Sequence, residues 1–244
     1  MPQKVNHRGA APEDDQLFSM EALPALREAT SDLSWLLNRG YAIHSALQLV
    51  GNRFNLRDRQ RLAVGRCVAS DASINRRRQH CLVPEQLREQ ELWLDGYNVL
   101  MVLEAALGGG VVLIGRDGCC RDVLGIHGSY HRVQETAPAL QLIGEFTQRW
   151  NVTGCRWLLD KPVSNSGRLK ALILDAAAQG GWNWEVELVM NPDNALAESP
   201  AVVATSDSAI LDRCELWANV AREVIFSSVP RARVVDLSVP AMAA

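Results

Sequence analysis

The sequence predicts an α/β fold, in which a mostly parallel sheet is sandwiched by helices, preceded by a small all-helical domain. From Glu91 onward, short apolar runs alternate with longer helical stretches, as in strands joined by helical crossovers. These strands are continuous apolar runs, the pattern of parallel strands covered on both faces. Before Glu91 the apolar spacing is helical. We therefore divide the chain into a flexible tail (1–18), a helical arginine-rich domain (19–90) and an α/β domain (91–244).

The helical domain is predicted to begin with a leucine-rich helix. Its leucines recur near helical spacing, and Gly40 predicts its end. Further helices are expected at about 41–50 and 56–70, and Pro84 opens a short helix or linker.

Six strands and five helices are expected in the α/β domain. The expected strands are 91–94, 111–114, 156–159, 184–190, 202–204 and 233–237. The expected helices are 99–107, 137–150, 166–179, 208–213 and 216–226.

Composition limits the cellular setting. The apolar share of 48% supports a real core and argues against wholesale disorder. The sequence has no apolar run near the roughly 20 residues of a membrane span, and residues 1–15 lack the apolar core of a secretory signal. The six cysteines include no Cys-x-x-Cys pair, so we expect reduced structural thiols in a cytoplasmic protein without a membrane partner. His127 and His131 lie four apart, but the intervening glycine disfavours a helical metal site.

The net charge of −3 hides an uneven distribution. Residues 51–90 hold nine arginines against four acidic residues, a local charge of +5, whereas residues 91–244 carry −6. A basic segment beside an acidic domain is typical of a nucleic-acid-binding arm on a metal-dependent body, although a solvated helical face gives the same pattern. The arginines expected to bind nucleic acid are Arg57, Arg59, Arg61, Arg66, Arg76, Arg77 and Arg78.

Aspartates follow four of the expected strands. In open parallel sheets, ligands bind outside the carboxyl ends of the strands, so residues after different strands converge there. Clustered carboxylates repel one another unless a cation compensates, and hard oxygen ligands suit Mg²⁺ or Mn²⁺. Separate capping and turn roles remain the alternative. The candidate metal ligands are Asp95, Asp117, Asp160 and Asp207.

Two segments resemble motifs of one nuclease family. Leu94-Asp95-Gly96-Tyr97-Asn98 is similar to the opening motif of PIN-like nuclease domains of the NYN branch, and Thr205-Ser206-Asp207 resembles their later Thr-x-Asp motif. The resemblance covers roughly residues 91–237. The whole chain also resembles a prokaryotic family that joins a helical domain of unknown function, of the type numbered 434, to a PIN-like domain.

The resemblance implies a PIN-like, Rossmann-like fold and assigns roles to particular residues. Asp95 and Asp207 would be metal ligands, and Asn98 would orient the first carboxylate or a bound water. The further acid that PIN domains carry about four residues after Thr-x-Asp is replaced here by Leu211, which leaves Asp212 as a doubtful ligand. Glu104 is available as an acid on the first helix, but its apolar neighbours also allow a simple solvent-facing position.

The loop after the third expected strand offers an anion site. Ser164, Asn165 or Ser166 would cap the following helix, whose first N–H groups would point toward the same edge of the sheet. Lys161 and Arg168 would add positive charge, so Lys161 and Ser166 join the expected nucleic-acid contacts. An ordinary capped loop is the alternative.

These observations favour a Mg²⁺- or Mn²⁺-dependent nuclease acting on RNA. The sequence leaves open whether it forms a homo-oligomer. A non-catalytic nucleic-acid-binding or adaptor protein on the same scaffold is the first alternative, since fold does not fix function. A small-molecule phosphohydrolase or nucleotide-binding protein is the second. The sequence shows no phosphate-binding glycine motif after a strand and no evident Ser–His–Asp or Cys–His arrangement.

Overall fold

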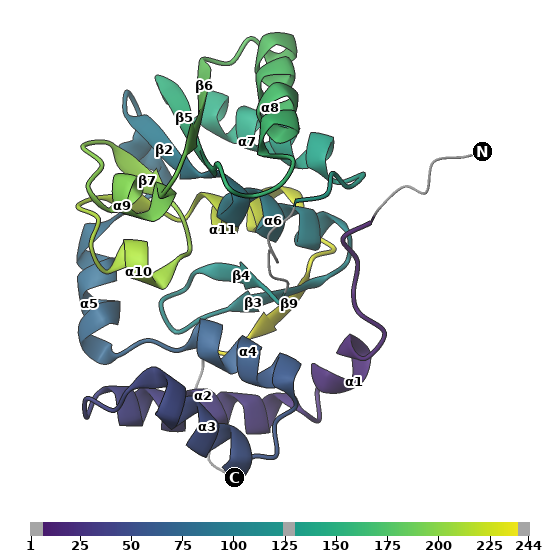
Figure 1. Ribbon diagram of the computed structural model, residues 1–244, viewed down its shortest axis with the longest axis vertical. Coiled ribbons are helices and arrows are strands. Elements are labelled where there is room, and N and C mark those ends of the chain that lie inside the picture. Colours follow the sequence, from purple (N-terminus) through teal and green to yellow (C-terminus); the bar gives the residue numbers. More distant parts are fainter. Residues whose placement is uncertain (1–6, 124–129, 239–244) are drawn as a thin grey trace.

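The computed structural model describes residues 7–123 and 130–238, which form stacked layers of helices and sheets (Figure 1). Within these residues, the larger sheet has six strands in the order β1-β8-β7-β2-β5-β6, and every pair is parallel. The expected α/β fold with a mostly parallel sheet is therefore confirmed. In chain order these strands are β1 (Cys81–Leu82), β2 (Glu91–Asp95), β5 (Gly154–Asp160), β6 (Trp184–Val189), β7 (Val202–Ala204) and β8 (Trp217–Ala218).

Helices cover both faces of this sheet. One face packs against a layer of four helices, α6 (Gly96–Leu107), α7 (Thr136–Arg149), α8 (Ser166–Gly180) and α11 (Val220–Ser228). The other face packs against two short helices, α9 (Pro192–Ala197) and α10 (Ser208–Leu211). The expected helix 216–226 instead begins at Val220, because Trp217 and Ala218 pair with β7 as strand β8.

A second sheet separates the α/β part from the N-terminal helices. It has three strands in the described chain, β3 (Val111–Ile114), β4 (Cys120–Asp122) and β9 (Arg233–Asp236). Strands β3 and β9 are parallel, as the sequence suggests, but they do not join the larger sheet. Side chains of β3 alternate between two cores: Val112 and Ile114 face the α6 layer, whereas Val111 and Leu113 face the N-terminal helices.

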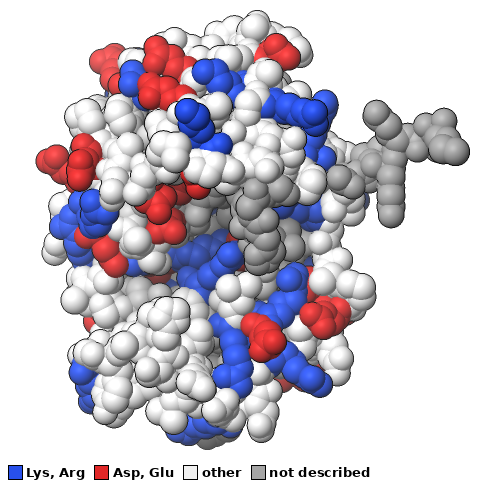
Figure 2. Space-filling view, viewed as in Figure 1, with Lys and Arg blue, Asp and Glu red and all other residues white. Residues whose placement is uncertain are grey.

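The N-terminal helices α2 (Leu23–Leu37), α3 (Ile43–Arg53) and α4 (Asp58–Cys67) form a core with the outer face of this second sheet. Helix α5 (Asp71–His80) instead lies beside α10 (Figure 1), and a 3-10 turn η1 (Pro84–Leu87) leads into β2. The core of α2, α3 and α4 includes Val235 and Leu237 as well as Val111 and Leu113. The helical region therefore shares its core with strands from the α/β region instead of closing a core of its own. Figure 2 shows a hollow between the upper and lower parts of the molecule, lined by lysine and arginine side chains.

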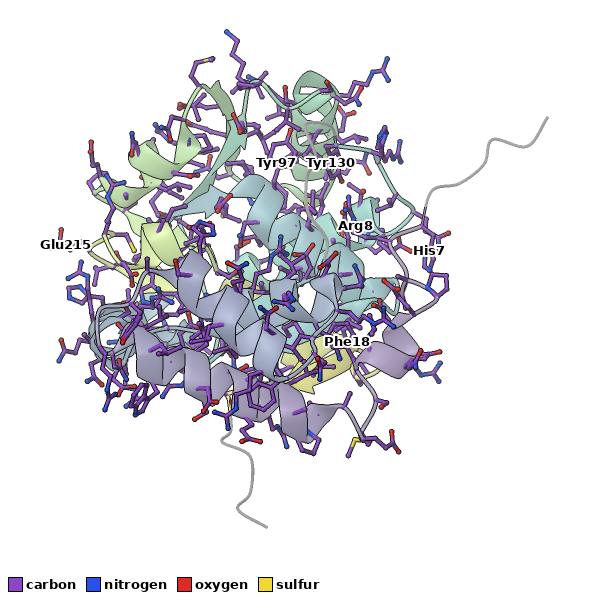
Figure 3. The ribbon with its side chains drawn as sticks, turned by 60° about the horizontal axis from the view of Figure 1, so that its bottom comes forward. His7, Arg8, Phe18, Tyr97, Tyr130 and Glu215 are labelled. Carbon is purple, nitrogen blue, oxygen red and sulfur yellow. The ribbon has the colours of Figure 1, made fainter. Side chains whose placement is uncertain are left out.

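Residues 7–18 are not the flexible tail that the polar composition suggests. Asp14, at the start of α1 (Asp14–Leu17), is fully buried and accepts hydrogen bonds from the guanidinium of Arg59. Arg8 pairs with buried Glu104 at 2.6 Å, near the aromatic rings labelled in Figure 3. These ion pairs bind the segment to α4 and α6, which a composition count does not reveal.

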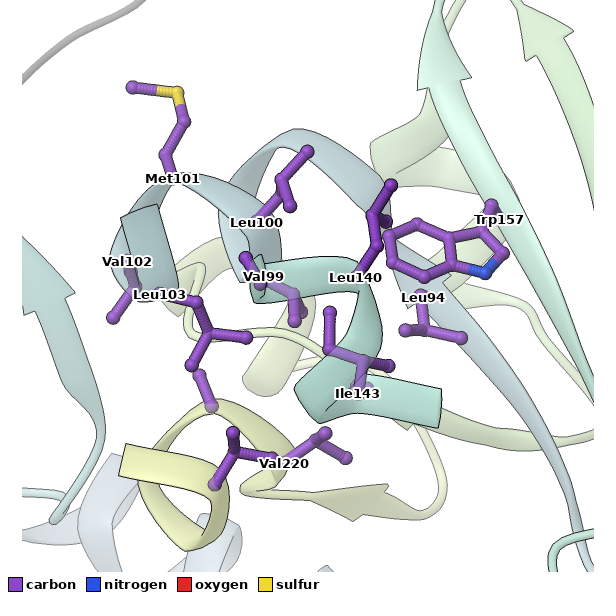
Figure 4. Packing of buried hydrophobic residues seen from close by; sticks show 14 of the residues in the cluster. Leu94, Val99, Leu100, Met101, Val102, Leu103, Leu140, Ile143, Trp157 and Val220 are labelled. Atoms are coloured by element: carbon purple, nitrogen blue, oxygen red, sulfur yellow. The ribbon is translucent and has the colours of Figure 1, made fainter. Parts of the chain in front are cut away.

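Helix α6 lies at the centre of the fold. It follows β2 directly, and ten of its residues are buried, including apolar side chains on all sides. A helix that is apolar all round is one surrounded by protein. Figure 4 shows its side chains packed against Leu140 and Ile143 of α7, Trp157 of β5 and Val220 of α11. This packing fixes the end of β2, and with it the start of the candidate site.

Candidate functional site

Five aspartates line one cavity of about 590 Å³, four of them from neighbouring strand ends of the larger sheet and the fifth, Asp122, from β4. Asp95 ends β2, Asp160 ends β5, and Asp207 follows β7. The fourth, Asp193, lies in the first turn of α9, directly after β6. The structure thus brings three of the four candidate ligands together at the carboxyl edge of the larger sheet and adds one that the sequence analysis missed.

Asp95 is half-buried in this acidic group. Its Oδ2 accepts a hydrogen bond from Thr205 Oγ1 at 2.8 Å. Burial raises the pKa of Asp95 to about 7, because the hydrogen bond from Thr205 does not offset desolvation and the negative charges of Asp207 and Asp193. The pKa of Asp193 is also raised, by burial and then by Asp207 and Asp160. The cluster therefore holds negative charge at an energetic cost.

Asp207 is held by the backbone of its own loop. Its Oδ1 caps α10 by accepting hydrogen bonds from the N–H groups of Ala209 at 2.7 Å and Ile210 at 3.3 Å. Its own N–H donates to Thr205 Oγ1 at 3.0 Å, the hydroxyl that donates to Asp95. The Thr205 hydroxyl therefore links the Asp95 carboxylate to the backbone of Asp207.

Asn98 supports the site differently from the expectation. Its Oδ1 accepts hydrogen bonds from the N–H of Ser206 at 2.9 Å and from Ser206 Oγ at 2.7 Å. The side chain thus ties α6 to the loop before Asp207, and it is the backbone N–H of Asn98 that interacts with Asp95. Asn98 still lines the cavity, but it orients the loop and not the Asp95 side chain.

Asp193 was missed because the expected strand ran through Met190 and no helix was expected after it. The sequence signal is present in Asn191-Pro192-Asp193. Asn191 caps α9 by accepting from the N–H of Asn194 at 3.2 Å, and Pro192 occupies the first helical position. An asparagine followed by proline after a strand marks a helix start, which places Asp193 at the same edge as the other acids.

Asp117 does not belong to this cavity. It follows β3, a strand of the second sheet, so its turn does not share the edge at which β2, β5 and β7 end. Its carboxylate is 1% exposed and is paired with Arg77 and Arg121. Although burial opposes it, these two guanidiniums hold the pKa of Asp117 well below its usual range. Asp212 likewise lies outside the cavity lining and pairs with Arg77.

A buried polar cluster forms the wall behind Tyr97. The Tyr97 ring lines the cavity and packs against the ring of Tyr130, with centroids 5.6 Å apart (Figure 3). Tyr130 Oη and Thr136 Oγ1 both donate to Glu104, which also pairs with Arg8. Glu104 is therefore a buried structural acid and neither faces solvent nor reaches the cavity. Burial, and then the charge of Asp160, raise the pKa of Tyr97 to about 12.

Another part of the cavity lining carries arginines and comes from helix α4 and strand β4. Gly65 and Arg66 of α4 line it together with Arg121 of β4. Arg66 Nη1 donates to the carbonyl and the carboxylate of Asp122, at 2.8 and 2.7 Å. Arg66 is 31% exposed, and no partner of its other guanidinium nitrogens is found in the described chain. Arg66 therefore pairs with one cavity-lining acid, Asp122, and keeps further guanidinium N–H groups available.

Most of the other expected nucleic-acid contacts serve the fold. Arg59 pairs with Asp14, Arg77 is buried, and Arg76 donates to three carbonyls at the end of α10. Arg61 binds Asn52 Oδ1 and the carbonyl of Leu56. These contacts join the arginine-rich helices to other helices and to the loop after α10, and charge counting does not reveal them.

Four expected contacts remain to be placed. Arg57 and Arg78 are exposed and have no ion pair or side-chain hydrogen bond in the described chain. Lys161 is exposed beside Asp160. Ser166 is buried, and its hydroxyl donates to the carbonyl of Lys161 at 3.3 Å, so it closes the loop instead of facing a ligand.

The donor chemistry of the cavity fits a hard divalent cation. Asp95, Asp160, Asp193 and Asp207 supply carboxylate oxygens, and none forms an ion pair with a lysine or arginine of the described chain. The four are spread around the cavity: across the described residues, no three His, Cys, Asp or Glu side chains already form a metal-binding group. The histidine pair considered above cannot be assessed, because His127 lies outside the described residues.

Two further expectations concern the cellular setting. The six cysteines are all free thiols, and five of them are buried. Among residues 7–123 and 130–238, no helix has the length and apolar character to cross a membrane.

The molecule is therefore an α/β protein with an acidic cavity bordered by helix α4 of the N-terminal region. Residues 84–223 match the family described as "Domain of unknown function (DUF5616)", and the chain belongs to this family. Residues 25–80 match "Protein of unknown function (DUF434)", in agreement with the expected type of helical domain. Neither description names a PIN or NYN domain.

One relative is an uncharacterized protein of Methanocaldococcus jannaschii. It is 31% identical over 187 residues, which cover 77% of this chain and 89% of the relative. No solved structure matches the chain significantly.

Proposed function

We propose that this protein is a Mg²⁺- or Mn²⁺-dependent nuclease that hydrolyses RNA phosphodiester bonds, with a PIN-like catalytic domain of the NYN branch. The observation that carries the proposal is the uncompensated acidic group at the sheet edge. Four of the five carboxylates that line the cavity have no lysine or arginine of the described chain paired with them, and Asp95 is half-buried among them. Such an arrangement is stabilised by a bound cation.

Asp95 and Asp207 would hold the cation, with Asp160 and Asp193 near enough to line the same cavity. The chemistry that the cation supplies when bound is a lowered pKa of water and neutralisation of charge on the leaving oxygen. Through its hydroxyl, Thr205 ties the Asp95 carboxylate to the backbone N–H of Asp207. The available guanidinium N–H groups of Arg66 would neutralise a substrate phosphate in the cavity.

RNA is the proposed partner, and the cytoplasm the proposed compartment. The exposed Arg57 and Arg78 and the cavity-lining Arg66 supply positive charge for a phosphate backbone. Six free thiols are typical of a reducing compartment.

The decisive experiment is cleavage of a fluorescent RNA with and without Mn²⁺ by wild type, Asp95→Asn and Asp175→Asn. Asp175 is an exposed aspartate of α8 outside the cavity lining, so its variant controls for a lost surface charge. We expect Mn²⁺-dependent cleavage by wild type and Asp175→Asn only. Tight, salt-sensitive RNA binding without cleavage would instead indicate a nucleic-acid-binding or adaptor protein.

One observation favours a second candidate, a phosphohydrolase acting on a small phosphate ester or nucleotide. Because Arg59, Arg61, Arg76 and Arg77 are engaged within the protein, only a short basic surface is left for a long nucleic acid. A cavity of about 590 Å³ falls within the usual range for small-ligand sites. Mn²⁺-dependent turnover of bis-p-nitrophenyl phosphate and nucleotides, with no RNA cleavage, would favour this candidate.

A further inference from the structure

A buried ion network joins helix α5 of the N-terminal region to the loop that carries Asp207. Its members are Arg77, Asp117 and Arg121, with side chains 3%, 1% and 7% exposed; we call them the arginine latch. Asp117 Oδ1 accepts from Arg121 Nη1 at 2.8 Å, and its Oδ2 accepts from Arg121 Nη2 at 2.6 Å and from Arg77. Asp117 thus holds the two guanidiniums against each other.

Both guanidiniums donate hydrogen bonds to the backbone on either side of Asp207. Arg121 Nε donates to the carbonyl of Ser206 at 2.8 Å, and Arg77 Nη2 donates to the carbonyl of Ser208 at 3.3 Å. Arg77 Nε also donates to Asp212 Oδ1 at 2.7 Å, just beyond the end of α10. The residues before and after the candidate ligand, and the helix that it caps, are therefore all attached to the latch.

The other side of the loop is attached to the α/β core. Asn98 holds the N–H and hydroxyl of Ser206, and Thr205 donates to Asp95. Asp207 Oδ1 is used in capping α10, and no hydrogen bond of its Oδ2 is found in the described chain. The backbone is clamped from both sides while one carboxylate oxygen stays available at the cavity.

We infer that Arg77 is a positioning residue that fixes the Asp207 carboxylate, so that the N-terminal helical domain completes the site of the neighbouring domain. The inference rests on the proposed function for what Asp207 binds. Groups that hold metal ligands in place are worth about 10- to 100-fold in metal affinity or activity. A displacement of about 1 Å has an effect of similar size on a reaction.

The test uses the full-length protein and the variants Arg77→Lys and Asp14→Asn. Lysine keeps the buried positive charge but cannot contact Asp117, Asp212 and the Ser208 carbonyl together. Asp14→Asn is the matched control, because it weakens a buried aspartate–arginine pair of the same domain that does not contact the Asp207 loop. Asp212→Asn, at the 38% exposed rim of the latch, replaces Arg77→Lys if that variant does not fold.

Three readouts are measured: Mn²⁺ affinity by titration calorimetry, hydrogen exchange of a peptide covering residues 205–212, and kcat and KM for RNA. For Arg77→Lys we expect about tenfold weaker Mn²⁺ binding, faster exchange in this peptide, and a lower kcat at unchanged KM. Asp14→Asn should match wild type in all three below its melting temperature.

Unchanged exchange and Mn²⁺ affinity in a folded Arg77→Lys protein would overturn the inference. Equal changes in Asp14→Asn would overturn it too, because they would show that the latch contributes only to the overall stability of the fold. If wild type neither binds Mn²⁺ nor cleaves RNA, the proposed function fails. Hydrogen exchange then still decides whether the latch positions the Asp207 loop.

Discussion

The acids of this protein form two groups that differ in what balances their charge. Asp14, Asp117 and Glu104 have side chains at most 1% exposed, and each is paired with arginine. Asp95 and Asp207 line an open cavity, and neither is paired with a cation of the described chain. In the first group, arginines of the protein itself offset the desolvation of each buried carboxylate. In the second group, a bound ligand would have to supply the positive charge. This difference distinguishes a candidate site from a structural ion pair.

The largest effect should come from breaking a compensated acid. Asp117→Asn removes the charge that holds Arg77 and Arg121 together and leaves two buried guanidiniums uncompensated. We expect the free energy of unfolding to fall by about 3 to 5 kcal/mol, the usual loss when one partner of a buried ion pair is removed. Urea unfolding measures it. A loss below about 1 kcal/mol would show that Asp117 is not the structural acid described here.

Removing an uncompensated acid should not lower the free energy of unfolding. Metal-free Asp95→Asn should be as stable as wild type or slightly more stable, because one charge leaves a repelling group. Wild type should gain about 2.7 kcal/mol from Mn²⁺ at 100 times its Kd, and the variant should lose most of this gain. Thermal melts with and without Mn²⁺ test both points. A destabilised metal-free variant with an intact Mn²⁺ shift would make Asp95 a structural residue.

The pH dependence of stability should separate the groups further. The pKa of Asp117 is lower in the folded protein than its ordinary value of 3.8. Its ion pairs therefore contribute fully above about pH 4, and the contribution shrinks as pH falls further, by about 1.4 kcal/mol per pH unit. The stability difference between wild type and Asp117→Asn should narrow correspondingly below pH 4 in denaturant titrations. A constant difference down to pH 2 would contradict the ion-pair explanation.

The smallest effect concerns the exposed arginines. Arg57 and Arg78 should contact phosphates, so replacing both by alanine should reduce the slope of log K against log salt by about 1 to 2. Arg76→Ala should instead lower stability, because its guanidinium donates to carbonyls near α10. RNA binding by fluorescence anisotropy across a salt series checks the first statement. An unchanged slope would show that Arg57 and Arg78 are solvated surface residues that do not contact RNA.

The sequence predicts elements well where a local pattern and the final environment agree. The runs before Asp95 and Asp207 are continuous and apolar, and both become buried parallel strands whose ends share one edge. Asp117 follows a run of the same kind, but β3 pairs with β9 and β4 in another sheet. Which strands pair depends on contacts between residues over a hundred positions apart, and a local window contains no information about them. The same limit applies to Arg59 and Arg77, whose partners Asp14 and Asp117 lie 45 and 40 residues away.

The shared core of the N-terminal helices has a consequence for the order in which the protein folds during synthesis. Leu26, Leu33 and Val64 leave the ribosome early, yet the core that buries them includes Val235 and Leu237. Contacts this distant in sequence form late, because the entropy of closing the intervening chain must first be overcome. The helical layer is therefore synthesised first, but its core is completed only when the last strand has been synthesised. Val111 and Leu113 of β3 reach this core earlier, and we expect the part of the apolar face that β9 covers to stay exposed until β9 is made.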